Sequence, residues 1–138
     1  MADLNHKRIN DIDAITGMLE GVSMYRAASD LGLRAFGMSI VELERGADAY
    51  PEHDHDPEGI GAKMFEKRPE QFGQEEVYVA LKGSGTVVAD GEEYPLDPDH
   101  VIRVGPEVTR KVLPGADGMR LLIVGATPGR AYGTGDAP

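Results

Sequence analysis

The sequence predicts an all-β fold, a sandwich or a barrel, and three observations carry that prediction. Glycine (18) and proline (9) are frequent and spread along the 138 residues, as expected where many short strands are joined by turns. From Leu33 onward, short runs of β-branched and apolar residues recur at near-regular spacing, which is typical of sandwiches and barrels. Within residues 76–81, side chains of different character alternate along the chain, as they do on the two faces of a strand.

Residues 1–32 are the least regular part of the chain. Residues 8–15, RINDIDAI, alternate weakly and are a candidate first strand. Residues 16–32 fit a helix, because Met18, Leu19 and Val22 share one helical face, yet Gly17 and Gly21 interrupt that pattern and a strand fits as well. We expect residues 1–32 to form an N-terminal strand or extension that packs on the barrel or on a dimer partner.

Residues 33–125 contain the strands expected to form the barrel. Residues 33–43 are β-rich, and residues 75–85 form a strand that we expect to end at Gly83 and Gly85. Residues 86–96 are predicted to form a hairpin, because Asp90-Gly91 is a strong two-residue turn signal. Three more strands are expected in residues 100–106, 109–113 and 119–126, and the turn-rich residues 126–138 are expected to form a loose tail.

The predicted strand at residues 76–81 has two unequal faces. One carries Glu76, Tyr78 and Ala80, and the other is purely aliphatic, with Val77, Val79 and Leu81. Such an aliphatic face needs a cover, either a second layer of the same chain or a partner subunit. A homodimer and an intramolecular cover both satisfy this requirement.

Composition excludes several classes of function. The chain has no cysteine, so it has no disulfide, thiol nucleophile or thiolate metal site. Its net charge of −10 opposes binding to nucleic acid. No apolar run approaches the roughly 20 residues of a membrane span, and the first 15 residues lack the apolar stretch of a secretory signal. These observations favour a cytoplasmic protein with no membrane or nucleic-acid partner.

Two of the four histidines form the pair His53 and His55, one residue apart. On an extended chain their side chains project from the same side, whereas Glu52 and Asp54 point the other way. A carboxylate opposite the pair would complete a set of two histidines and one carboxylate, which suits a divalent transition ion and leaves positions open. Glu76, at the start of the next firm strand, is the natural candidate.

These residues follow a recognisable spacing. Gly46 is followed by six residues, by His53-Asp54-His55, by a spacer, and by Glu76 with Gly83 after six further residues. This pattern, together with the strand and turn rhythm of residues 94–112, resembles the cupin superfamily. The resemblance implies a double-stranded β-helix, a jelly-roll-like barrel, with a central pocket. It also implies a metal ion (Fe, Mn, Ni, Cu or Zn) bound by His53, His55 and Glu76.

Two features depart from the cupin pattern. The spacer between His55 and Glu76, residues 56–75, is 20 residues long instead of three or four, so we expect it to form a hairpin or a flap over the barrel mouth. The resemblance also places Arg110 where cupins have a fourth ligand, a histidine. Arginine stays protonated and cannot bind a metal ion, and His100 lies at the wrong end of its strand to replace it.

Arg110 leaves two functional interpretations open. In the first, the chain is a small metal-binding cupin, in which Arg110 and Tyr78 contact a small carboxylated or oxygen-rich molecule and enzymatic activity is an open question. In the second, Arg110 replaces the ion and neutralises Glu76 in a metal-free pocket for a small ligand. A third possibility, a purely structural β-domain, assigns no ligand to residues 53–76.

Overall fold

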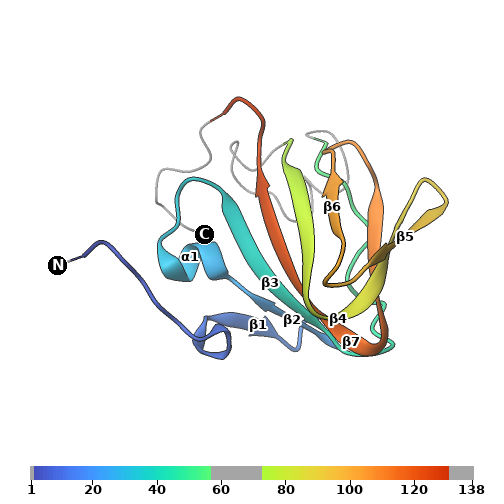
Figure 1. The fold of residues 1–138 in the computed structure, drawn as a ribbon, viewed down its shortest axis with the longest axis horizontal. Helices are drawn as coiled ribbons and strands as arrows, with labels where there is room; N and C mark the ends of the chain where they lie inside the picture. The colour runs from blue at the N-terminus through green and yellow to red at the C-terminus, as the bar shows by residue number, and fades with distance from the viewer. Residues whose placement is uncertain (1, 57–72, 131–138) are drawn as a thin grey trace.

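The computed structural model describes residues 2–56 and 73–130, and this part of the chain is built on antiparallel β-strands. The sheet order is β1-β2-β3-β7-β4-β5, with β6 also paired to β4 (Figure 1). The all-β prediction is therefore confirmed. The elements are η1 (Ile9–Asp11), β1 (Ala14–Thr16), β2 (Val22–Tyr25), α1 (Ala27–Leu31), β3 (Gly37–Leu43), β4 (Glu75–Ala89), β5 (Glu92–Leu96), β6 (Val101–Val104) and β7 (Arg110–Ala126).

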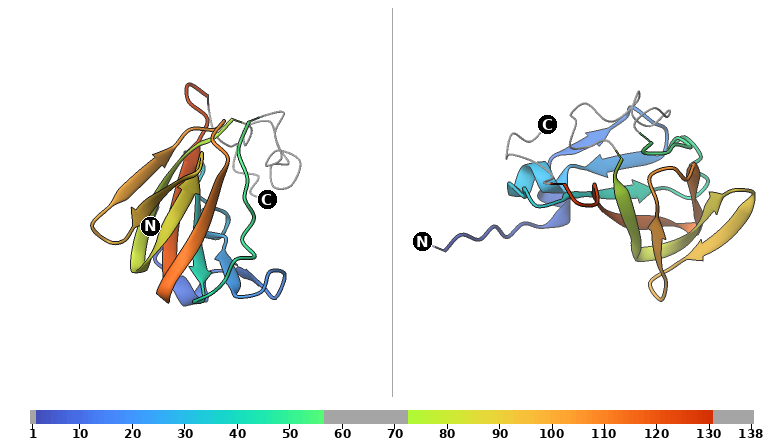
Figure 2. Two further views of the ribbon diagram at one scale, coloured as in Figure 1. Left: turned by 90° about the vertical axis from the view of Figure 1, so that its right-hand side faces the viewer. Right: turned by 90° about the horizontal axis from the view of Figure 1, so that it is seen from above.

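Strands β4 and β7 pair with each other along almost their whole length and bend together (Figures 1 and 2). The first half of β4 also pairs with β6, and its second half pairs with β5. The expectation that the strand ends at Gly83 and Gly85 is wrong, and so is the expected division of residues 109–126 into two strands. The turn-forming residues make an irregular corner inside one ladder, where the pairing jumps from Gly83–Met119 to Gly85–Pro114.

Gly83 explains why this corner needs glycine. Its φ of +70° lies in the left-handed region, and a Cβ at this position would lie 2.2 Å from the carbonyl oxygen of Gly118. A side chain would separate the two backbones at the point where they cross. The predicted hairpin at Asp90-Gly91 is confirmed, with φ values of 51° and 76° that fit a tight two-residue turn between β4 and β5.

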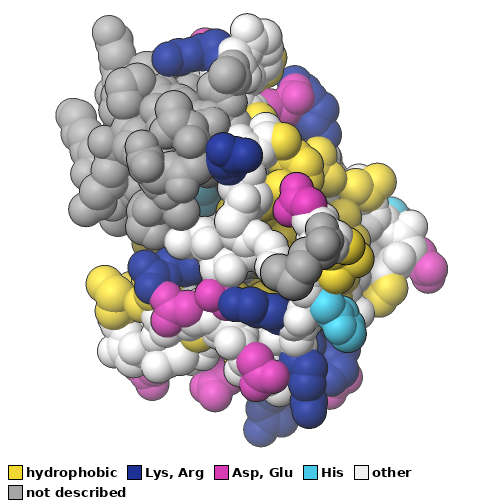
Figure 3. Space-filling view, turned by 90° about the vertical axis from the view of Figure 1, so that its left-hand side faces the viewer, with side chains coloured by type: hydrophobic (Ala, Val, Ile, Leu, Met, Phe, Trp, Pro, Cys, Tyr) yellow, Lys and Arg dark blue, Asp and Glu magenta, His cyan; other side chains and the backbone are white. Residues whose placement is uncertain are grey.

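The N-terminal segment adds two strands to the sheet beyond β3. The candidate strand at residues 8–15 is confirmed only at Ala14 and Ile15, which lie in β1. Residues 9–11 form a 3-10 turn instead, because the N–H groups of Asp11 and Ile12 bond to the carbonyls three residues earlier. Residues 16–32 contain both a strand and a helix, β2 and α1. Ion pairs of Lys7 with Asp30 and of Arg26 with Asp13 link separate parts of the N-terminal segment. Figure 3 shows charges of both signs side by side on the side of the molecule where this segment lies.

The inner face of the curved sheet carries the apolar core. Tyr78 and Ala80 are buried on it, whereas Val77 and Val79 on the opposite face are half-buried and Leu81 is 42% exposed. The core cluster comprises Val22, Val41, Leu43, Tyr50, Tyr78, Ala80, Val87, Leu96, Val104, Val112, Met119, Leu121 and Ile123.

Two expectations fall partly on residues that the structure does not describe. The predicted hairpin or flap within residues 56–75 lies almost entirely in residues 57–72, and most of the predicted tail lies in residues 131–138. Within the described ranges, no helix is long and apolar enough to cross a bilayer.

Candidate functional site

The segment that carries the histidine pair runs beside the start of β7. His53 and Arg110 exchange two backbone hydrogen bonds, of 3.0 and 2.8 Å, and the N–H of His55 donates to the carbonyl of Pro106 at 2.7 Å. The N–H of Gly73 in turn donates to the carbonyl of His55 at 2.8 Å. These bonds hold the segment extended, so both imidazoles project to the inside, where they are 3% and 7% exposed.

His53, His55 and Glu76 lie together inside the molecule. One donor atom from each residue lies within 4.8 Å of the other two, and Nε2 of His55 lies 3.2 Å from Oε1 of Glu76. Two donor atoms that bind one ion at right angles, each at about 2.1 Å, lie about 3 Å apart. The spacing of His55 and Glu76 therefore fits two neighbouring ligands of one ion.

His53 has the orientation of a metal ligand. Its Nδ1 lies 2.9 Å from the carbonyl oxygen of Pro51, and a carbonyl accepts only from a protonated nitrogen. The lone pair of the neutral ring is then on Nε2, and a hydrogen bond of this kind commonly orients a ligating histidine. The His53 ring also meets the rings of His55 and Tyr50 edge-on, at centroid distances of 5.2 and 5.9 Å.

Arg110 is fully buried beside the same carboxylate. Its Nη2 donates to Oε1 of Glu76 at 2.8 Å, its Nε donates to the hydroxyl of Tyr78 at 3.0 Å, and its Nη1 donates to the carbonyl of Val108 at 2.6 Å. The Tyr78 hydroxyl donates to Oε1 of Glu76 at 2.9 Å. Arginine, tyrosine and carboxylate thus form one connected group, which the structure places against the two histidines.

The charges in this group are set by burial and by mutual contact. Burial raises the pKa of Glu76, but its contact with His55 at 3.2 Å and the positive charge of Arg110 outweigh burial and hold that pKa at about 2. Burial lowers the pKa of His53, and burial raises the pKa of Tyr78 well above its usual range, with the charge of Glu76 adding to the effect. At neutral pH the site therefore holds a carboxylate, a neutral His53 and a protonated tyrosine.

All five residues singled out from the sequence meet in one place: His53, His55, Glu76, Arg110 and Tyr78. That they bind a metal ion or a substrate stays a prediction. His100, which the sequence analysis set aside, is exposed and pairs with Asp97 at 2.7 Å. Sequence reasoning missed Tyr50, which is 6% exposed, and Gln74, which is 7% exposed. Gln74 stands two residues before Glu76, so strand alternation was the signal that could have found it.

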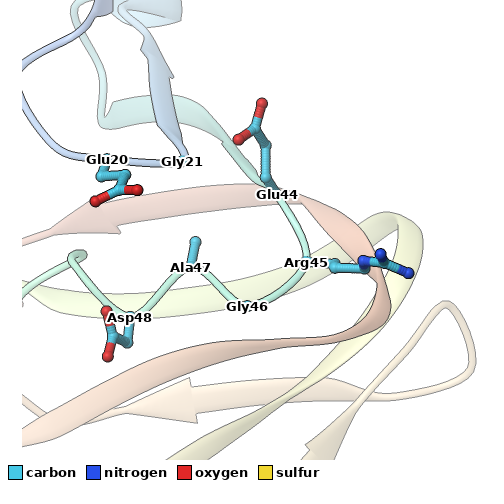
Figure 4. A pocket seen from close by; sticks show the side chains of 7 residues that line it. All are labelled: Glu20, Gly21, Glu44, Arg45, Gly46, Ala47 and Asp48. Carbon is cyan, nitrogen blue, oxygen red and sulfur yellow. The ribbon is translucent and has the colours of Figure 1, made fainter.

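A cleft lies elsewhere on the molecule, between the turn before β2 and the turn after β3. It is lined by Glu20, Gly21 and residues 44–48. The carboxyl groups of Glu20, Glu44 and Asp48 point in different directions (Figure 4), so they offer no shared position for a cation. This cleft is separate from the group around Glu76.

No protein-family model matches the sequence, and no curated protein matches it significantly. Similarity is found among solved structures. A sugar phosphate isomerase of the cupin superfamily from Silicibacter pomeroyi is 20% identical, with a TM-score of 0.65 over 88% of this chain and 75% of that one. A predicted oxalate decarboxylase from Thermotoga maritima is 17% identical, with a TM-score of 0.62 over 87% and 96% of the two chains.

A third structure extends the likeness over nearly the whole sequence. A cupin protein from Bacteroides fragilis is 19% identical and has a TM-score of 0.58, over 97% of this chain and 92% of that one. At these identities the likeness concerns the fold, and it agrees with the curved antiparallel sheet described above. The resemblance inferred from the histidine and glycine spacing is confirmed at that level: this chain has the cupin fold.

Proposed function

We propose that this chain is a small cupin that holds one divalent transition-metal ion and binds a small carboxylated or oxygen-rich molecule beside it. The observation that supports the proposal most directly is the convergence of two imidazoles and one carboxylate, all buried, to within 4.8 Å. His53, His55 and Glu76 would hold the ion. Such a donor set suits Fe, Mn, Ni, Cu or Zn and leaves coordination positions open for a ligand.

An ion bound there would supply a Lewis acid that polarises an oxygen of the bound molecule. The protonation states of the residues in the site suit the binding of such an ion. The neutral state of His53 and the ionised state of Glu76 are the forms that ligate a metal. Arg110 is fully buried and donates one N–H from each nitrogen to protein groups. Its other two N–H donors would bond to an anionic group of a ligand that enters the site as far as the guanidinium. Tyr78 adds its hydroxyl at the same point.

Metal content tests the proposal. Protein purified without a tag and without chelators should carry about one equivalent of a divalent metal, since three protein ligands form one site. His53→Ala removes a ligand and should lose the metal. His100→Ala is the matched control, because this exposed histidine pairs with Asp97 away from the site and its loss should leave the metal content unchanged.

A folded wild-type protein that carries no metal, and takes up none on dialysis against these ions, would contradict the proposal. The same result would favour a second candidate, a metal-free cupin that binds a small molecule. The contact of Arg110 with Glu76 at 2.8 Å supports that candidate, because the guanidinium already neutralises the carboxylate. Thermal stabilisation by small organic acids would then separate a binding protein from a purely structural domain.

We also propose a homodimer that covers the outer face of β4 and β6. Val101 is 67% and Leu81 is 42% exposed on this face. Val79 lies between them, since it pairs with Val101 across the sheet. Exposed aliphatic side chains that adjoin one another in this way favour a protein contact.

A further inference from the structure

Gln74 lies on the same face of the chain as the residues of the candidate site. Residues 74, 76, 78 and 80 are buried, whereas residues 75, 77 and 79 between them are half-buried. Backbone bonding fixes the start of this run, because the N–H of Gly73 donates to the carbonyl of His55 at 2.8 Å. Gln74 is therefore held between His55 and Glu76 and faces the inside.

Gly125 shows where the side-chain amide of Gln74 lies. Gly125 is the partner of Glu76 in the pairing of β7 with β4, and its neighbours on the inner face of β7, Leu121 and Ile123, are buried. A Cβ on Gly125 would lie 3.0 Å from Oε1 of Gln74 and 3.2 Å from Cγ of Glu76. The missing side chain makes room for the amide oxygen of Gln74 next to the side chain of Glu76.

The side-chain amide of Gln74 has no protein partner within the described residues, and its polar atoms keep a little contact with solvent although the residue is largely buried. Its residue is 7% exposed, and the structure gives its side chain no hydrogen bond, ion pair or other polar partner in residues 2–56 and 73–130. Most polar side chains that are this far buried have such a partner. The donor and acceptor atoms of this amide are therefore available to a molecule bound in the site.

We infer that Gln74 is a ligand-binding residue that selects for hydroxyl groups in the molecule bound at this site. An amide offers two donor hydrogens and an acceptor oxygen without net charge, so it matches a hydroxyl, which both donates and accepts. The nearby charges, Glu76 and Arg110, match a metal ion and a carboxylate. The ligand class is thus a small polyhydroxylated carboxylic acid, and this inference rests on the proposed function for the position of its acid group.

A matched pair of probes tests the hydroxyl preference. D-gluconate and hexanoate both have six carbons and one carboxylate, but only gluconate carries hydroxyls. Wild-type protein should bind gluconate about tenfold or more tightly than hexanoate by titration calorimetry, because only the hydroxyls of gluconate supply the hydrogen-bond partner that the amide lacks. No preference for gluconate in the wild type would overturn the inference.

Variants of Gln74 then assign the preference to this side chain. Gln74→Leu keeps the volume and removes the amide, so the ratio of the two affinities should fall to near one. Gln74→Glu keeps the shape and adds a negative charge, so it should weaken gluconate binding as well and serves as the second variant if Gln74→Leu does not fold. An unchanged ratio in a folded variant would show that Gln74 has only a packing role.

Metal content measured on the same samples separates this inference from the proposed function. Gln74 is not a predicted ligand of the ion, so both variants should keep the metal content of the wild type. A protein without metal that still prefers gluconate, and loses the preference in Gln74→Leu, would contradict the metal site and support the role of Gln74. A protein that carries metal but shows no preference for gluconate would support the metal site and contradict the role of Gln74.

Discussion

Arg110 is completely buried and carries a full positive charge, and the groups around it explain how this charge is stabilised inside the protein. The carboxylate of Glu76, the hydroxyl of Tyr78 and the carbonyl of Val108 each accept one of its N–H groups. A buried ion pair that is hydrogen-bonded in this way contributes modestly as a pair, but removal of one member leaves the other charge buried and uncompensated. The stability of the site therefore depends on keeping Glu76 next to some cation.

Replacement of Arg110 separates its role from that of a metal ion. Arg110→Met should lower the free energy of unfolding by about 3–5 kcal/mol, because the Glu76 carboxylate loses its buried partner. Added Zn²⁺ should recover more stability in this variant than in the wild type, since the ion can take over the neutralisation of Glu76. Denaturant unfolding with and without Zn²⁺ measures both effects.

Arg103→Met is the matched control. Arg103 pairs with Glu75 on the outer face, where the two side chains are 64% and 37% exposed, and an exposed pair contributes under about 1 kcal/mol. A loss as small in Arg110→Met as in Arg103→Met would contradict the account of the buried pair.

At the residue scale, the sequence predicts the site well where alternation and spacing act together. The i, i+2 spacing placed both histidines on one side, and alternation placed Glu76 and Tyr78 on one face. Gln74 was missed because its proposed role depends on the absence of a hydrogen-bond partner and on the space at Gly125, 51 residues later in the chain. Tyr50 was missed because the sequence does not show that its ring contacts the ring of His53.

Strands β4 and β7 show which part of the fold local sequence signals predict and which part they do not. The glycines and prolines of residues 83–85 and 114–118 are turn signals, and the chain does change direction there. A local signal does not tell whether the strand ends or bends, because that depends on the partner strand. Here each strand continues past the corner, since the other bends at the same place and pairing resumes at Gly85 and Pro114.

A side chain at the corner tests this account. Gly83→Ala should destabilise the protein by more than about 2 kcal/mol, because it adds backbone strain at positive φ and a contact of 2.2 Å with the backbone of Gly118. Gly91→Ala is the control, since its φ of +76° carries similar strain but its Cβ would meet nothing within 4 Å. Thermal unfolding of both variants provides the comparison, and equal losses would show that backbone strain alone matters at the corner.

The whole molecule carries a net charge of −10, so two copies repel each other unless their contact is locally neutral. The outer face of β4, β6 and β7 approaches this condition, because Arg103 and Arg120 are already paired with Glu75 and Glu42, which leaves Lys82 as an unpaired basic residue among the described residues of this face. Between these pairs lie the aliphatic side chains of Val77, Val79, Leu81, Val101, Leu122 and Val124. A largely apolar face with few unpaired charges on an acidic protein fits a second copy of the same chain.

A charge placed on this face should prevent the association. We expect the wild type to be a dimer by light scattering coupled to size-exclusion chromatography, and Val101→Glu to be a monomer with unchanged thermal stability of the fold at high dilution. Met18→Glu is the matched control, because Met18 is 78% exposed but lies in the turn between β1 and β2. A wild type that stays monomeric at high concentration, or a Val101→Glu variant that stays dimeric, would contradict the proposed face.

The ladder of β4 and β7 has one more consequence, for the order in which the site forms. Arg110 pairs through its backbone with Ala89 at the far end of β4, yet its guanidinium reaches Glu76 near the beginning of the same strand. The two groups meet only where the sheet has curled around, and contacts between such distant segments cost loop-closure entropy and slow folding. Affinity for an ion or a sugar acid would then report whether the chain has finished folding, and an incompletely closed molecule would bind neither.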